Sequence, residues 1–81
     1  MVVANRAKRR HRRLSLEERK QIDKALLEMV RDPLKGDVKF LRGTRGALRR
    51  RIGDWRIIFE LDREKRMILI IDVTRRGSHT Y

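Results

Sequence analysis

Four arginines lie close together around a short turn near the middle of the chain. Arg49 to Arg51 are consecutive, a Gly-Asp dipeptide follows shortly after them, and Arg56 comes directly after the turn and Trp55. Guanidinium groups this close repel one another and cost stability unless an anion meets them. Phosphate is an anion that arginine binds well, through two parallel hydrogen bonds. The pattern therefore indicates a surface that binds phosphate, and such a surface also suits phosphodiester cleavage, in which negative charge grows in the transition state.

More arginines are expected to reach the same surface from neighbouring strands. Side chains alternate along a strand, which predicts that Arg49 and Arg51 share one face. Arg56 begins the next expected strand, and Arg75 and Arg76 follow the end of the last one. If these strands are neighbours, guanidinium groups from three places converge. The alternative is a charged surface that only keeps the protein soluble, but solubility requires neither arginine over lysine nor clustering at strand ends.

Groups that could transfer protons are fewer, because arginine holds its proton too tightly to be an easy general acid or base. Asp54, Glu60 and Asp72 are possible bases, although the first resembles a turn former and the other two resemble strand residues. His79 could move protons near neutral pH, but a lone histidine near a chain end is more often a solvated surface residue. Tyr81 could stack on a base or simply fray.

Composition limits the possible partners. The chain has 81 residues and a net charge of +12, with 17 arginines and 6 lysines. Nucleic acid is the favoured partner, because a membrane-surface protein would be expected to pair basic residues with bulky aromatics on an amphipathic helix. Cysteine is absent and the two histidines lack metal-ligand spacing, so we expect no cofactor and no metal. No apolar run is long enough to span a membrane and no signal peptide is recognisable, so we expect a soluble, cytoplasmic protein.

Residues 15–32 have the pattern of an amphipathic helix. Ser15 and Glu18 are spaced for a capping box, and Pro33 should end the helix. Apolar residues recur at helical spacing and are expected to share one core-facing side. These residues are Ile22, Ala25, Leu26, Met29 and Val30.

The second half of the chain alternates with the period of β-strands. Strands are predicted at 38–41, 48–52, 55–61 and 66–73, the last apolar on both faces like a central strand. We therefore expect one α+β domain over residues 1–81, with an N-terminal helix or helical hairpin packed on a small antiparallel β-sheet. Residues 1–13 form a basic N-terminal segment that could be helical or a disordered arm, and could be solvated or could contact RNA.

Three runs of sequence resemble the RelE/ParE toxin superfamily. They are DPLKGDVKFLRG, LRRRIGDWRIIFELD and ILIIDVTRRGSHTY, and the resemblance extends from about residue 14 to residue 81. The most specific part is R-x-R-[IV]-G-D-aromatic-R-[IV]-[IV]-[FY]-E, followed by V-x-x-R and a closing tyrosine. The resemblance implies a RelE-like fold. Members with RelE-type activity are toxins of type II toxin–antitoxin systems that cut messenger RNA in the ribosomal A site and so inhibit translation.

The resemblance also implies roles for individual residues in a reaction without a metal, in which the RNA 2′-hydroxyl attacks the adjacent phosphate. Arg49 and Arg51 would help to activate the nucleophile, and Arg56 would stabilise the phosphate. Arg76 would protonate the leaving oxygen, with His79 as the competing proton donor, and Tyr81 would stack on a base. Further cations expected to contact RNA are Lys39, Arg42, Arg45, Arg50 and Arg75.

The same resemblance implies two partners and leaves other functions open. The partners are messenger RNA in the A site of the 30S ribosomal subunit and an acidic antitoxin, whose helix could cover exposed apolar surface while its acids neutralise the arginines. The main alternative is a ParE-type toxin that inhibits DNA gyrase without catalysis. Those members generally lack the converging basic residues and the closing tyrosine. The third possibility is an RNA- or ribosome-binding module that does not cut RNA.

Overall fold

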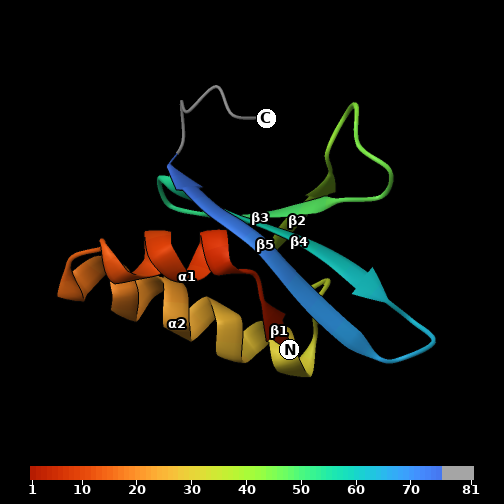
Figure 1. The fold of residues 1–81 in the computed structure, drawn as a ribbon, viewed down its shortest axis with the longest axis horizontal. Helices are drawn as coiled ribbons and strands as arrows, with labels where there is room; N and C mark the ends of the chain where they lie inside the picture. Colours follow the sequence, from red (N-terminus) through yellow and green to blue (C-terminus); the bar gives the residue numbers. More distant parts are fainter. Residues whose placement is uncertain (76–81) are drawn as a thin grey trace.

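A helical hairpin packs against one side of a five-stranded sheet in the computed structural model, which describes residues 1–75 (Figure 1). The strand order is β1-β5-β4-β3-β2, in which β1 pairs with β5 in parallel and all other neighbours are antiparallel. This arrangement confirms the expected α+β fold. The elements are β1 (Val2–Val3), α1 (Asn5–Arg12), α2 (Leu16–Arg31), β2 (Asp37–Phe40), β3 (Leu48–Ile52), β4 (Trp55–Asp62) and β5 (Met67–Arg75).

The main helix, α2, begins and ends where its sequence predicts. The Ser15 hydroxyl oxygen accepts a hydrogen bond from the Glu18 amide at 3.2 Å, and the Ser15 amide donates to the Glu18 carboxylate at 2.9 Å. This capping box satisfies backbone donors that the first helical turn leaves unpaired. The helix ends at Arg31, two residues before Pro33, because the residue before a proline avoids the helical region.

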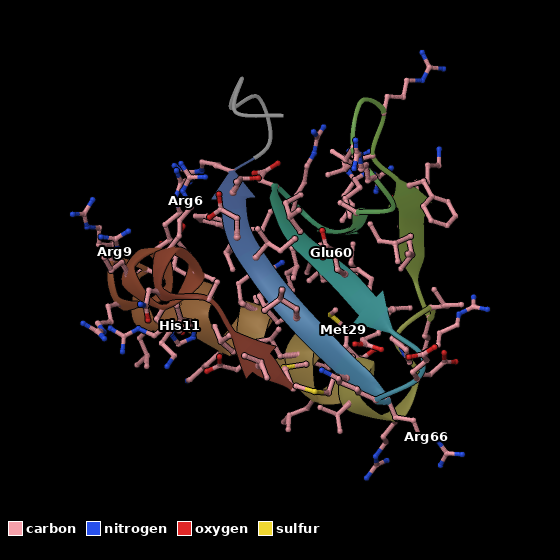
Figure 2. The ribbon with its side chains drawn as sticks, turned by 45° about the vertical axis from the view of Figure 1, so that its right-hand side comes forward. Arg6, Arg9, His11, Met29, Glu60 and Arg66 are labelled. Carbon is pink, nitrogen blue, oxygen red and sulfur yellow. The ribbon has the colours of Figure 1, made fainter. Side chains whose placement is uncertain are left out.

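The core-facing side of α2 is narrower than its apolar pattern suggests. Ile22, Ala25 and Met29 are buried, and Figure 2 shows Met29 between the helix and the sheet. Val30 is 61% exposed, so its expected place on the buried side was wrong. A helix turns by about 100° per residue, which carries Val30 away from the line through Ala25 and Met29.

The N-terminal segment folds into a very short strand and the helix α1, which answers the open question about residues 1–13. Ala7 is the one buried residue of α1, so apolar packing contributes little to holding this helix. Polar contacts also link it to the rest of the fold: Arg10 Nε lies 3.2 Å from Asp72 Oδ1 on β5, and His11 Nε2 lies 2.7 Å from Asp23 Oδ1 on α2. Within residues 1–75, neither helix is both long and apolar enough to cross a membrane.

Alternation along β3 and β4 divides the sheet into two faces. Leu48, Ile57 and Phe59 belong to the core beneath the helices, as the alternating pattern predicts. We call this face the helix side of the sheet. The intervening residues of β3 and β4 form the opposite face, which we call the open face; among them are Arg49, Arg51, Arg56 and Ile58.

Candidate functional site

Strand register brings two arginines directly together on the open face. Arg51 on β3 lies opposite Arg56 on β4, and Arg56 lies opposite Thr74 on β5. Residues paired across neighbouring strands project to the same face, with side chains close enough to interact. Like charges at such positions are destabilising. The Arg51–Arg56 pair is therefore a local cost to the fold.

Neither arginine of this pair forms an ion pair with a carboxylate of residues 1–75. The Arg56 Nε is also buried without a hydrogen-bond partner among these residues. A buried N–H without an acceptor costs free energy that an incoming anion can recover. The pair is therefore suited to receive a phosphate.

Arg49 lies on the same face but is already held by an acid. Its Nη1 donates to both the Asp37 carbonyl and the Asp37 Oδ1, each at 3.3 Å. Lys39 lies directly opposite Arg49 on the edge strand β2 and is exposed. The structure thus brings Lys39, Arg49, Arg51 and Arg56 to one face, with the charge of Arg49 partly compensated.

Arg50 lies on the helix side, away from its two arginine neighbours. Its side chain passes beneath α2, where Nη2 contacts Glu28 Oε2 at 3.0 Å and Nη1 donates to the Ala25 carbonyl at 3.3 Å. The residue is only 7% exposed. The hydrogen bond from Arg50 lowers the pKa of Glu28 below its ordinary value. Arg50 therefore links the sheet to α2 and is not brought to the open face.

The loop between β2 and β3 carries two more of the expected RNA-binding cations. Arg42 and Arg45 are both exposed, and Figure 1 shows their loop projecting away from the helices. Its ends are fixed by a hydrogen bond from the Leu41 amide to the Ala47 carbonyl at 2.9 Å, and Thr44 Oγ1 donates to the Leu41 carbonyl at 2.8 Å. These hydrogen bonds fix the two ends of the loop beside β3, so Arg42 and Arg45 project from an anchored loop.

Arg75 ends β5 on the helix side, opposite Trp55. Its guanidinium carbon lies 5.5 Å from the centroid of the Trp55 ring, and its Nη2 lies 3.7 Å from Glu18 Oε2. The pKa of Glu18 is lowered, mainly by the hydrogen bonds of the Ser15 backbone and side chain, with the Arg75 charge adding to them. The other expected residues of the C-terminal segment, Arg76, His79 and Tyr81, lie outside the described residues.

Of the candidate bases, Asp72 shares the face of the arginine pair, because it lies opposite Ile58 and two residues before Thr74 on β5. Asp72 is fully buried, and Arg10 and Arg6 of α1 lie 3.2 and 3.9 Å from its carboxylate. Glu60 is exposed further along β4, as Figure 2 shows, and Asp54 is exposed in the turn. Within residues 1–75, no three histidine, aspartate or glutamate side chains are grouped so that they could hold a metal ion.

Comparison with known families matches nearly the whole chain. The model for the ParE toxin of the type II toxin–antitoxin system parDE matches residues 4–79. The chain belongs to this toxin family. It is therefore a toxin of the type II toxin–antitoxin class, within the RelE/ParE superfamily that its motifs resemble. A search of curated protein sequences finds no match.

Solved structures of RelE proteins share the fold of this toxin. The RelBE2 complex of Mycobacterium tuberculosis has a TM-score of 0.81 at 24% identity, over 91% of this chain and 93% of that one. The intact RelBE complex of E. coli has a TM-score of 0.79 at 24% identity, over 95% of each chain. The archaeal RelE–RelB complex of Pyrococcus horikoshii has a TM-score of 0.78 at 22% identity, over 93% of this chain and 91% of that one.

Two features near the arginine pair were given no functional role from the sequence. Thr74 is buried directly opposite Arg56, and its place in the last strand was a signal that could have identified it. Arg10 and Arg13 line a cavity together with Trp55 on the helix side of the sheet. No sequence signal identifies this cavity, because it depends on how the helical hairpin packs against the sheet.

Proposed function

We propose that this toxin is a ribosome-dependent endoribonuclease that cuts messenger RNA in the A site. The supporting observation is the Arg51–Arg56 pair, in which two guanidinium groups lie directly opposed on the open face and the Arg56 Nε has no acceptor among residues 1–75. A phosphate between them would replace repulsion with charge-assisted hydrogen bonds. The same groups would stabilise the additional negative charge of the pentacoordinate transition state.

The proposed reaction is an internal transfer that needs no added water or metal. The RNA 2′-hydroxyl releases its proton to solvent as its oxygen attacks the adjacent phosphorus, the bond from phosphorus to the 5′-oxygen breaks, and that oxygen takes up a proton from the protein. The products are a 2′,3′-cyclic phosphate and a 5′-hydroxyl. Arg51 and Arg56 hold the phosphate, and Arg49, oriented by Asp37 at 3.3 Å, favours the developing 2′-oxyanion. Arg76 or His79 protonates the leaving oxygen, and Tyr81 stacks on a base.

A gyrase inhibitor is the second candidate function, and the family match favours it, because the matching family model is that of ParE. In that case the toxin would act by binding and the open face would need no reacting phosphate. The Arg51–Arg56 pair favours the nuclease, since two opposed guanidinium groups and a buried Arg56 Nε without an acceptor among residues 1–75 suit a phosphate bound between them.

We also propose that an acidic antitoxin helix covers an apolar groove at the far end of α2. The groove is a cavity of about 650 Å³, and a smaller neighbouring cavity extends it to Phe40, which is 74% exposed. Three arginines and one aspartate are among the lining residues, so the rim is positively charged. The lining residues of the larger cavity are Val30, Arg31, Pro33, Leu34, Leu61, Asp62, Arg63, Arg66, Met67 and Ile68.

The charge of the rim decides which partner suits this groove. An amphipathic helix with acidic residues flanking its apolar side would fill the cavity and pair with Arg31, Arg63 and Arg66. The RelE proteins of Mycobacterium tuberculosis and E. coli were solved in RelBE toxin–antitoxin complexes, which supports an antitoxin as this partner.

The test of the nuclease is messenger RNA cleavage by purified toxin with programmed ribosomes. Arg56→Ala and Arg76→Ala should each slow cleavage by at least about tenfold, because each removes a charge that stabilises the transition state. Arg63→Ala, which removes one exposed arginine from the β4–β5 turn, is the matched control and should cut at nearly the wild-type rate. If well-folded wild-type toxin leaves the RNA intact, the nuclease assignment is wrong and inhibition of gyrase supercoiling is the next assay.

A further inference from the structure

A second basic cavity lies on the helix side of the sheet, at the turn between α1 and α2. It has a volume of about 390 Å³ and opens between the helical hairpin and the adjoining ends of β4 and β5. This volume is in the range of cavities that bind small molecules. Its lining residues are Arg10, Arg13, Leu14, Glu18, Trp55, Val73 and Arg75.

The charge of this cavity is positive, because three arginines outnumber its one carboxylate. Glu18 already accepts a hydrogen bond from the Ser15 amide at 2.9 Å and lies 3.7 Å from Arg75. Arg10 is held by Asp72, whereas Arg13 is exposed and forms no ion pair with any residue of 1–75. Arg13 therefore brings a cation to the mouth of the cavity with its hydrogen-bond donors available.

An aromatic ring stands beside these cations. Trp55 is half-buried in the wall, with the Arg75 guanidinium 5.5 Å from its ring centroid, while Leu14 and Val73 supply buried apolar surface. Bases of single-stranded nucleic acid stack on aromatic rings and on the guanidinium planes of arginine, and their phosphates bind cations. The cavity therefore combines a surface for a base with groups for a phosphate.

The cavity adjoins the Arg51–Arg56 pair across the end of the sheet. Trp55 and Arg56 are consecutive and project to opposite faces of β4, and Arg75 and Thr74 do the same on β5. A single strand that rounds this end of the sheet could contact both places with neighbouring nucleotides. Because Trp55 and Arg56 are consecutive, a nucleotide in the helix-side cavity would lie next to the phosphate expected on the open face.

We propose that this cavity is a subsite for one nucleotide of single-stranded RNA, flanking the phosphate held by Arg51 and Arg56. The base takes the place of the Arg75 guanidinium over the Trp55 ring, and Arg75 and Arg13 bind its phosphate. The inference rests on the proposed function in naming RNA as the polymer, but binding in the cavity does not require cleavage. A nucleotide in this position would give the toxin a preference for sequence beside the cleaved bond.

The chain contains a single tryptophan, Trp55, so its fluorescence reports directly on this cavity. Full-length toxin is titrated with a 2′-O-methyl oligoribonucleotide, which cannot be cut because its 2′-oxygen is blocked. Stacking on Trp55 should quench its fluorescence. Arg13→Gln should weaken binding by at least about fivefold, because it removes a charge-assisted phosphate contact.

The matched control is Arg9→Gln on α1, the helix whose C-cap is Arg13. Arg9 is exposed, does not line the cavity and points away from the sheet (Figure 2). The two variants lose equal charge, so any difference in RNA binding between them reflects position and not net charge. Arg9→Gln should weaken binding by less than about twofold, and circular dichroism should show the same helix content in both variants. Equal weakening in both variants would show diffuse attraction to α1 and overturn the subsite.

Further titrations separate the chemistry of the ligand. Inorganic phosphate should bind far more weakly than the oligoribonucleotide, and polyglutamate should not quench Trp55. Binding of phosphate alone with equal affinity, equal quenching by polyglutamate, or no quenching by RNA would each overturn the proposal. Loss of ribosomal cleavage activity with intact RNA quenching would contradict the proposed function and leave this subsite standing.

Discussion

Arg51 on β3 lies directly opposite Arg56 on β4, whereas the adjacent Arg50 is neutralised by Glu28 at 3.0 Å beneath α2. Of these two neighbouring arginines of β3, Arg50 stabilises the fold through a carboxylate, whereas Arg51 is repelled by another cation. The helix-side arginine is buried and paired, and the open-face arginine is placed against another cation. The repulsion between Arg51 and Arg56 lowers the stability of the folded toxin, and binding of an anion between them would offset this loss.

Replacement of Arg51 should make the toxin more stable and less active. Arg51→Gln removes the repulsion with Arg56 and should raise the free energy of unfolding by about 0.2–1 kcal/mol. Cleavage with programmed ribosomes should slow by at least about tenfold, because one of the two phosphate contacts is lost. Urea unfolding and the cleavage rate are measured on the same preparation, and a clear loss of stability would contradict the repulsion.

Replacement of Arg50 should have the opposite effect. Arg50→Gln breaks the contacts with Glu28 and Ala25 and should lower the free energy of unfolding by about 1–3 kcal/mol, less than for a fully buried pair because water reaches Glu28. The cleavage rate per folded molecule should change by less than about threefold, since Arg50 does not reach the open face. Arg51→Gln serves as the control of equal charge. Cleavage that falls as far as in Arg51→Gln would place Arg50 in the site.

Acid should weaken the link between the sheet and α2. Because Arg50 lowers the pKa of Glu28 in the folded state, the stability that this pair contributes is complete above the ordinary value of 4.5 and disappears as pH falls through the lowered pKa. Thermal unfolding of wild-type toxin and Glu28→Gln is compared from about pH 3 to about pH 7. The difference in stability between them should shrink as pH falls below 4.5. A difference that stays constant over this range would show that ionised Glu28 does not stabilise the fold.

The apolar groove should be needed for the antitoxin and not for cleavage. Phe40→Ser removes a ring that is 74% exposed at the extended end of the groove and should weaken binding of the cognate antitoxin by about tenfold or more. Leu27→Ser is the matched control, because Leu27 is 71% exposed on α2 and does not line the groove. Isothermal titration of the antitoxin gives both affinities. If Phe40→Ser and Leu27→Ser bind the antitoxin with equal affinity, the antitoxin binds elsewhere on the toxin.

Short-range signals were sufficient to predict most of the elements. The spacing of Ser15 and Glu18, together with Pro33, located the ends of α2, because capping and proline geometry act within a few residues. The period of two in β3 placed Arg49 and Arg51 on one face. The same alternation assigns Arg50 to the other face, so the sequence already contained the signal that separates it from its neighbours.

Contacts between distant residues depend on how the whole chain packs. The pairing of Arg51 with Arg56 depends on the register of β3 and β4, and a shift of one residue would pair different side chains. The contact between Arg50 and Glu28 spans 22 positions, and α1 is docked by Asp72 from the other end of the chain. Local propensity determines helices and strands, but register and long-range ion pairs follow from how the whole core packs. Local sequence thus accounts for most of the helices and strands and for the basic character of this toxin, and packing determined which of its arginines are opposed, paired with an acid or left for an anion.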